Sequence, residues 1–192
     1  MKKRKVIAVN KLNFNPFPTL KTDRLLLRQL VMNDDERIFH YQSNEENFKF
    51  VDMPIYTSVE EAQNYVTKMN AGVSNNQWII WGIADAKTNS ILGTISIWNI
   101  STEQSKAELG FGLFPGSSGK GIMSEALVKV VEYGFEVMGL KTIEAYTNAM
   151  NHKSIALLER NQFTKIASFI ETETSNGVPM EMVVYGCCQV RK

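Results

Sequence analysis

The residues of this chain best suited to chemistry lie in a glycine-rich turn that leads directly into a helical pattern. Gly116, Gly119 and Gly121 occupy the turn, and apolar residues recur at helical spacing from Met123 onward. Glycine lets the backbone adopt positive φ and approach a ligand closely. The unpaired amides and the positive dipole end of a helix N-terminus attract anions such as phosphate. The turn therefore predicts a site for a phosphate-bearing ligand.

The same turn has other interpretations. A Gly-x-x-Gly-x-Gly spacing also suits a plain connection between a strand and a helix. Lys120 is followed by Gly121 instead of Ser or Thr, so the turn does not match the phosphate loop of nucleotide-binding proteins. The spacing also differs from the dinucleotide fingerprint Gly-x-Gly-x-x-Gly. Lys120 itself suits either a phosphate contact or a solvated surface lysine.

A carboxylate stands in the predicted strand before this turn. Over residues 106–114, the apolar side chains of Ala107 and Leu109 alternate with Glu108 and with glycines. Glu108 is therefore expected to face away from the apolar side. There its carboxylate could accept a proton, directly or through water, as a general base. A solvated or ion-paired glutamate is the competing interpretation.

Composition limits the classes of function. The 21 Lys and Arg against 20 Asp and Glu give a net charge of +1, which disfavours a nucleic-acid-binding surface. The apolar run at residues 6–9 is too short for a signal peptide, and no apolar segment reaches membrane-spanning length. We therefore expect a cytoplasmic protein without a membrane partner. His40 and His152 are far apart, and Cys187 and Cys188 are adjacent, so neither a metal site nor a long-range disulfide is expected.

The pattern along the chain predicts an N-terminal arm at residues 1–19 and one α/β domain at residues 20–192. Helices are expected from Asn33 into the early forties, from the capping box Ser58-Val-Glu-Glu61, between the glycine turn and Gly139, and over residues 151–160. Strands are expected over residues 24–30, 77–84, 91–100, 106–114, 142–147, 165–173 and 180–186, the last two joined at Ser175-Asn-Gly177.

The order of these elements and four local sequences together resemble the GNAT superfamily of acyl-CoA-dependent N-acetyltransferases. The likeness is greatest to the branch with ribosomal-protein N-terminal acetyltransferases of the RimJ/RimL type. The segments that carry it are LKTDRLLLR at 20–28, AELGF at 107–111, GKGIMSEAL at 119–127 and NHKSIALLERNQF at 151–163. The resemblance implies an α/β (α+β) fold, with a mixed, mostly antiparallel sheet of about seven strands flanked by about four helices.

The resemblance implies acetyl-CoA as cosubstrate, with no metal. The family's pyrophosphate signature begins with Arg or Gln where this chain has Gly116. That departure leaves the backbone amides of residues 118–122 to hold the diphosphate. Coenzyme contacts are implied for Phe111, Gly112, Leu113, Phe114, Ser118, Gly119, Lys120, Gly121, Ile122, Met123, Asn148, Asn151 and Ser154.

Further roles follow from the resemblance. A backbone amide near residues 112–114 would hold the oxyanion, and Glu108 is the candidate base. Leu158 stands where many relatives have a tyrosine acid, and Ser154 matches a serine that fills this role in RimL-like proteins. Local backbone hydrogen bonding is the other interpretation of Ser154. Asn151 would contact the pantetheine arm and can also cap its helix. Cys187 and its neighbour are poor nucleophiles, so direct transfer is expected.

The acceptor is expected beside residues 44–57 and the first strands. Candidate acceptor contacts are Phe48, Phe50, Trp98 and Glu108, although the aromatic residues could instead belong to the core. The expected partner is an amine-bearing small molecule or a protein N-terminus, such as that of a ribosomal protein, and the chain would act as a monomer or homodimer. Polyamine, amino-acid and antibiotic acetylation remain alternatives. A noncatalytic acyl-CoA-binding module is an alternative of another class.

Overall fold

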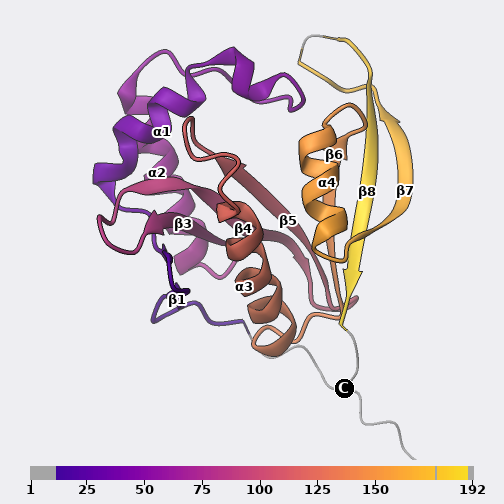
Figure 1. The fold of residues 1–192 in the computed structure, drawn as a ribbon, viewed down its shortest axis with the longest axis horizontal. Coiled ribbons are helices and arrows are strands. Elements are labelled where there is room, and N and C mark those ends of the chain that lie inside the picture. The colour runs from indigo at the N-terminus through magenta and orange to yellow at the C-terminus, as the bar shows by residue number, and fades with distance from the viewer. Residues whose placement is uncertain (1–11, 176, 190–192) are drawn as a thin grey trace, which may run out of the picture.

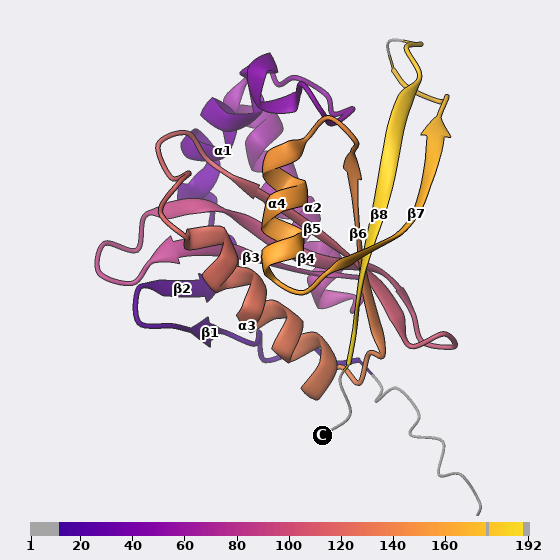
Figure 2. The same ribbon diagram turned by 45° about the vertical axis from the view of Figure 1, so that its right-hand side comes forward.

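The computed structural model describes residues 12–175 and 177–189, whose strands form one mixed sheet with helices on both faces (Figures 1 and 2). The eight strands follow the order β1-β2-β3-β4-β5-β6-β8-β7 across the sheet. Their bounds are Leu20–Lys21 (β1), Leu25–Arg28 (β2), Ile79–Asp85 (β3), Ile91–Ser101 (β4), Lys106–Leu113 (β5), Thr142–Asn148 (β6), Thr164–Glu171 (β7) and Met180–Cys188 (β8). The α-helices are Asp35–Gln42 (α1), Val59–Ser74 (α2), Ile122–Glu136 (α3) and His152–Arg160 (α4). The expected mixed, mostly antiparallel α/β fold is confirmed.

Strand alternation separates two differently covered faces. Ala107 and Leu109 of β5 are buried, and the register partner of Leu109, Ile97, lies against Gly134 of α3. Gly112 of the same strand instead lies against Tyr41 of α1. Helix α3 therefore covers one face of the sheet and α1 the other. The predicted orientation of Glu108, away from the α3 face, follows from the same period of two.

The helices begin at the signals read from the sequence. Ser58 and Glu61 form the predicted capping box of α2. Gly121 is the residue before α3 and has a left-handed φ of 74°, which glycine adopts without steric strain. The Asn151 side chain accepts a hydrogen bond from the Ser154 amide at the start of α4. Each of these local choices agrees with the global fold.

The start of α1 and the number of strands differ from the expectations, and several strand ends shift by one or two residues. Helix α1 starts at Asp35 instead of Asn33, because Asp34 does not cap it: its carboxylate binds Arg28, with both N···O distances 2.9 Å. A 3-10 turn, Met32–Asp34, precedes the helix instead. The sheet has eight strands instead of about seven because Leu20 and Lys21 pair with β2 as a short extra strand.

The N-terminal arm and the last hairpin are only partly described. Residues 1–11 of the arm and Asn176 of the predicted turn lie outside the described residues. In the described part of the arm, Phe14 is buried, and the Pro18 carbonyl accepts a hydrogen bond from the Trp81 indole at 2.7 Å. This end of the arm therefore packs onto the domain.

Strands β5 and β6 pair for only a short distance. They are parallel neighbours, and their register ends where Glu108 lies beside Glu144. Beyond this point the two strands diverge, and Figure 1 shows β5 running toward the α1 end while β6 runs beside α4. The β5 edge that faces β6 is thereby left without a strand partner over residues 109–113. The backbones of β5 and β6 separate here, and the opening between them is called the cleft below.

Gly93 on β4 provides a stability test of how closely β4 and β5 pack. A Cβ at this position would lie 2.3 Å from the Gly112 carbonyl oxygen and 2.9 Å from the Leu113 Cα. Because backbone atoms cannot rotate away, we expect Gly93→Ala to lower the free energy of unfolding by about 3 kcal/mol in urea titrations. The control is Gly82→Ala on β3, whose Cβ would meet side-chain ends at 3.1 Å and a backbone oxygen only at 3.6 Å, an ordinary van der Waals contact. Equal losses in the two variants would contradict the backbone clash.

Candidate functional site

The glycine turn between β5 and α3 is held open by its backbone conformation. Gly116, Gly119 and Gly121 have φ values of 81°, 79° and 74°. A Cβ at Gly116 or Gly119 would meet nothing within 4 Å, so conformation, not lack of space, requires glycine at these two positions. Residues 118–121 are exposed. The turn therefore presents its backbone to solvent.

Helix α3 points its N-terminus at this turn. The Glu125 amide makes an intrahelical bond to the Gly121 carbonyl at 3.1 Å. The amides of Ile122, Met123 and Ser124 precede it and belong to the first turn, where N–H groups lack intrahelical partners. The side chains of Ile122 and Met123 are buried, which fixes the direction of this turn. We call residues 116–124 the cradle.

The Lys120 side chain folds back onto the cradle. Its ammonium group donates to the Gly116 carbonyl at 2.9 Å. In this position it closes the turn on itself and adds a positive charge beside the exposed amides. Both predicted roles of Lys120, phosphate contact and surface lysine, stay compatible with this geometry.

An ion pair braces the cradle from outside. Arg24 donates to the Glu125 carboxylate from two of its nitrogens, at 2.8 and 2.5 Å, and to the Lys120 carbonyl at 3.1 Å. Thr22 also donates to Glu125. Burial alone raises the pKa of Glu125, but the hydrogen bonds from Thr22 and Arg24 and the Arg24 charge hold that pKa below its usual range. The loop before β2 is thus tied to the first turn of α3.

Helix α4 contributes the polar groups predicted for the coenzyme side. Asn151 uses its side-chain oxygen to accept from the Ser154 amide at 3.2 Å, which leaves its NH₂ group available. Within the described residues the Ser154 hydroxyl makes no hydrogen bond. The Asn148 side chain accepts from the Met150 amide at 2.8 Å. Leu158 is fully buried, so the position where relatives carry a tyrosine belongs to the core here.

A polar contact also joins α3 to α4. The Ser124 hydroxyl donates to the Asn161 side-chain oxygen at 2.9 Å, and Asn161 donates to the Leu157 carbonyl at 2.8 Å. The first turn of α3 is therefore held against the end of α4. The sequence pattern did not single out Asn161, because its partner lies 37 residues away.

The backbone of β5 turns every second amide toward the cleft. The Phe114 amide donates to the Leu92 carbonyl of the neighbouring chain segment at 2.8 Å. In an antiparallel ladder, alternate residues point their N–H groups to the same side. Gly112 therefore shares the direction of Phe114, while Phe111 and Leu113 direct their amides away from β4 and into the cleft. The oxyanion donor was predicted among residues 112–114. Of these three, only the Leu113 amide points into the cleft.

An acidic cluster lies where β5 and β6 part. Glu108 is half-buried, accepts a hydrogen bond from the Asn99 side chain and neighbours Glu144 in register. Glu144 is buried, pairs with Lys106 at 3.1 Å and accepts from the Tyr146 hydroxyl at 3.0 Å. Burial, this hydrogen bond and the charges of Glu144 and Glu108 raise the pKa of Tyr146 to about 12.

The sequence analysis missed Glu144 and Tyr146. The period of two that selected Glu108 also places Glu144 and Tyr146 on one face of their strand. That signal was present in the sequence. Both residues lie near Glu108 because β5 pairs with β6. A local sequence pattern does not predict which strands pair.

The predicted acceptor residues are only partly brought together. Trp98 is the cross-strand partner of Glu108, and its indole nitrogen lies 3.6 Å from where a Gly110 Cβ would be. Phe48 packs against Tyr41, with ring centroids 5.1 Å apart. Phe50 is half-buried and makes no aromatic contact within the described residues. Trp98, with 47% of its surface exposed, therefore fits an acceptor contact better than a core residue.

A contact between distant loops bridges the open end of the cleft. The Asp52 carboxylate accepts hydrogen bonds from the Ser175 amide, at 2.8 Å, and from the Ser175 hydroxyl. These hydrogen bonds lower the pKa of Asp52. Asp52 follows the turn Glu45–Phe48, and Ser175 lies between β7 and β8, so the two halves of the sheet meet here.

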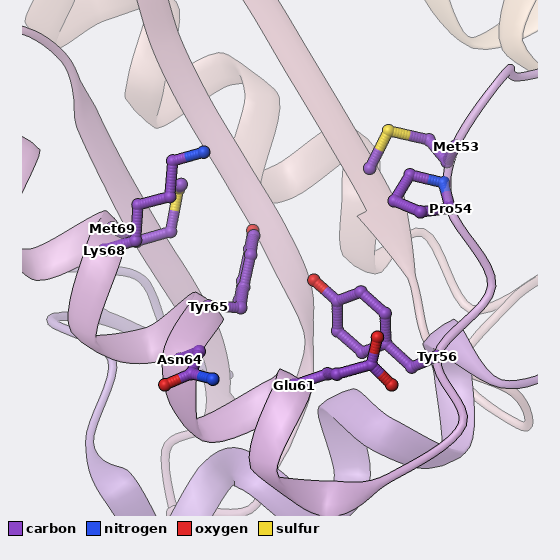
Figure 3. A pocket seen from close by; sticks show the side chains of 8 residues that line it. All are labelled: Met53, Pro54, Tyr56, Glu61, Asn64, Tyr65, Lys68 and Met69. Atoms are coloured by element: carbon purple, nitrogen blue, oxygen red, sulfur yellow. The ribbon is translucent and has the colours of Figure 1, made fainter. Parts of the chain in front are cut away.

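A cavity of about 440 Å³ lies between α2 and the segment before it (Figure 3). It is lined by Met53, Pro54, Tyr56, Glu61, Asn64, Tyr65, Lys68 and Met69. Burial, followed by the proximity of Tyr56 and Tyr41, raises the pKa of Tyr65. The cavity lies beside α2, which packs against α1. The aromatic and methionine side chains within residues 44–57 indicated an acceptor site in this region, but they did not predict the cavity.

The comparisons with known proteins agree with this geometry. Residues 24–164 match the model of the Acetyltransferase (GNAT) domain family. The chain is 33% identical over 176 residues to a Bacillus subtilis (strain 168) protein named Uncharacterized N-acetyltransferase YoaA, covering 92% of this chain and 99% of the relative. It is 30% identical over 167 residues to Uncharacterized N-acetyltransferase p20 of Bacillus licheniformis, covering 87% and 94%. The chain belongs to the GNAT acetyltransferases and is an acyltransferase enzyme.

Solved structures show the same fold. The ribosomal L7/L12 alpha-N-protein acetyltransferase RimL, in complex with coenzyme A, superposes with a TM-score of 0.79 at 20% identity, covering 89% of this chain and 98% of RimL. The microcin C7 self-immunity acetyltransferase MccE, in complex with acetyl-CoA and AMP, gives a TM-score of 0.79 at 23% identity, covering 88% and 94%.

The described residues lack both a membrane-spanning helix and a cluster of metal ligands. In residues 12–175 and 177–189, no helix is both long and apolar enough to cross a membrane. The same residues contain no group of three or more His, Cys, Asp or Glu side chains that could hold a metal ion.

The brace on the cradle predicts a pH-dependent contribution to stability. Because the pKa of Glu125 is lowered in the folded state, its contribution is present at neutral pH and is lost as the pH falls below about 4. We expect Glu125→Gln to lower the free energy of unfolding by about 1 kcal/mol at pH 7, with a smaller difference from wild type at acid pH. Urea titrations at several pH values measure this.

The matched control is Glu132→Gln on the same helix. Glu132 pairs with Lys129 at 2.9 Å, but both side chains are at least 40% exposed. An exposed pair contributes little, so this variant should change the free energy of unfolding by less than about 0.5 kcal/mol. If Glu125→Gln lowered the free energy of unfolding by the same amount at acid pH as at pH 7, the contact would not be ionic.

Proposed function

We propose that this chain binds acetyl-CoA in the cleft between β5 and β6 and transfers the acetyl group directly to a primary amine. The proposal rests on two structural features that follow one another along the chain, the β5 edge and the cradle. Cleft-facing amides of Phe111 and Leu113 lead along β5 to the cradle, whose exposed amides and helix dipole suit a diphosphate. The complexes of RimL with coenzyme A and of MccE with acetyl-CoA support the same ligand.

The amine has to lose a proton before or during attack. An alkyl amine has a pKa of about 10 and is mostly protonated at neutral pH. Glu108 is the proposed base, acting directly or through water, and Asn99 holds its carboxylate in place. The nitrogen then attacks the thioester carbon, and the C–N bond forms as the C–S bond breaks. The Leu113 amide is the proposed donor to the oxyanion.

The departing sulfur needs a hydrogen-bond donor. Ser154 is proposed for this role because its hydroxyl has no partner within the described residues and its helix borders the cleft. A hydroxyl does not titrate near neutral pH, so it stabilises the thiolate by donation. Burial and the neighbouring Cys188 raise the pKa of Cys187, which opposes formation of a nucleophilic thiolate there. Direct transfer is therefore preferred to an acyl-enzyme.

The acceptor we favour is the α-amino group of a protein or peptide. The similarity to RimL, named for acetylating the N-terminus of a ribosomal protein, supports this choice. A small amine is the second candidate, although the contact between Asp52 and Ser175 occupies one of the carboxylates that could bind it. Asp52 is engaged in that bridge, which weakens the case for a polyamine site built from it.

The test is a mass-spectrometric screen with acetyl-CoA. Peptides with free N-termini, ribosomal proteins, polyamines, amino acids and aminoglycosides are incubated with the enzyme, and an added 42 Da marks acetylation. Release of free thiol is measured in parallel. Coenzyme binding without amine-dependent thiol release across the whole panel would contradict the proposed transfer.

The cradle assignment predicts a loss of coenzyme binding in Gly119→Val. The β-branched side chain disfavours the positive φ of Gly119 and stands among the exposed amides. We expect calorimetric titration to show at least about 100-fold weaker binding of coenzyme A, since the backbone can no longer close on the diphosphate. The control is Gly177→Val, which has a similar φ of 69° but lies outside the cradle. Equal affinity in both variants would refute the assignment.

The base assignment predicts a pH-dependent defect in Glu108→Gln. Coenzyme affinity should be preserved, while kcat/KM falls by about 100-fold at pH 7. The deficit should shrink toward pH 10, where the amine is increasingly unprotonated. Pre-steady-state assays across this range measure it, with Glu103→Gln in the exposed β4–β5 turn as control. A deficit that is constant with pH would remove Glu108 from proton transfer.

A further inference from the structure

We propose that the Tyr41 hydroxyl is a second hydrogen-bond donor at the reaction centre, acting with the Leu113 amide on the thioester oxygen. The inference rests on the proposed acetyl transfer. It assigns a catalytic role to a residue of α1, on the opposite face of the sheet from α4.

The position of Tyr41 is fixed by aromatic packing. Its ring centroid lies 5.1 Å from that of Phe48 and 5.0 Å from that of Phe114. Phe114 is itself buried at the end of β5. Such packing on two sides restricts the side-chain rotamers of Tyr41, so its hydroxyl is held without a hydrogen bond to fix it.

The hydroxyl lies directly over Gly112. A Cβ added to Gly112 would be 2.9 Å from the Tyr41 hydroxyl oxygen, which would be its nearest neighbour. Gly112 therefore leaves room that the hydroxyl occupies. Gly110, the next residue on this face of β5, also lacks a side chain, and the Ser96 hydroxyl and the Trp98 indole lie over it, 2.8 and 3.6 Å from where its Cβ would be.

The hydroxyl and the cleft-facing amide converge. The Leu113 amide belongs to the peptide that follows Gly112, and it points in the plane of the sheet, toward the cleft. The Tyr41 hydroxyl approaches the same peptide from above the sheet. An oxygen placed in the cleft beside Gly112 can therefore accept from both. Two preorganised donors are a common means of stabilising an oxyanion.

The hydroxyl is available for this role. Among the described residues it has no hydrogen-bond partner, although its ring is largely buried. Tyr41 is half-buried and its hydroxyl oxygen is open to solvent, so the hydroxyl can donate to water or to a bound ligand. Burial also raises the pKa of Tyr41, which keeps the phenol protonated and able to donate at any working pH. Tyr41 is thus a donor and not a base.

The role requires no proton transfer from Tyr41. As the C–N bond forms, the carbonyl π electrons move to oxygen, and both donors stabilise the charge. As the carbonyl re-forms, the C–S bond breaks and the sulfur leaves with its electron pair. The amine proton goes to Glu108 or water, and Tyr41 retains its own.

The first test needs no acceptor. Infrared difference spectra of bound acetyl-CoA, labelled with carbon-13 at the carbonyl, report hydrogen bonding to the thioester oxygen. We expect the carbonyl band to lie at higher wavenumber in Tyr41→Phe than in the wild type, with the dissociation constant changed by less than about 2-fold. Tyr133→Phe, on α3 at the other face, is the control and should match the wild type. A carbonyl band at the same position in Tyr41→Phe and wild type overturns the proposal.

The same measurement separates the two proposals. If the wild type does not bind acetyl-CoA, the proposed function fails and the role of Tyr41 fails with it. If acetyl-CoA binds and the band does not move, only the role of Tyr41 is refuted.

The second test is a kinetic double-mutant cycle. Tyr41→Phe should lower kcat by about 100-fold with the acceptor KM unchanged, the scale of losing one oxyanion donor. Gly112→Ala should cause a similar loss, because its Cβ displaces the hydroxyl. The next atom of Tyr41 is 3.5 Å away, an ordinary contact, so the double variant should be no slower than either single variant. Additive losses, or an effect on the acceptor KM alone, overturn the proposal.

Discussion

The short parallel pairing of β5 with β6 is the constraint on which the site depends. Every other neighbouring pair of strands in the described sheet is antiparallel and continues along most of the shorter strand. Between β5 and β6 the register ends at Glu108 and Glu144. Unpaired backbone amides are costly when buried, so a strand edge that opens in the middle of a sheet needs another partner. The pantetheine arm of a coenzyme is a suitable one.

The opening also explains why the site has two sides. Helices α3 and α4 cover one face of the sheet, and they supply the cradle and Ser154. Helix α1 and the following segment cover the other face and supply Tyr41. The helices on the two faces of the sheet come together at the cleft only because β5 and β6 separate there. Coenzyme and acceptor can thus approach the same backbone peptide from opposite faces.

The cradle is a conformational feature that needs external support. Its glycines permit the required φ values, but glycine also loses more backbone entropy on folding than other residues. Arg24 and Thr22 on one side and Asn161 on the other hold the first turn of α3 in place. Without the Arg or Gln of the family signature, the backbone carries more of the expected phosphate contact. Rigid support of that backbone is therefore more important in this chain.

The amino-acid sequence by itself determined the element types, most of their bounds and the orientation of Glu108, because these follow from local periodicity and capping. It also identified the glycine cradle and the Asn151 cap. It did not locate Glu144, Tyr146, Asn161 or Tyr41 in the site. Each of these reaches its partner through pairing or packing between segments far apart in the chain. Only the tertiary structure decided which amides of β5 face the cleft, because that depends on the register of β5 with β4 and on where β6 leaves β5.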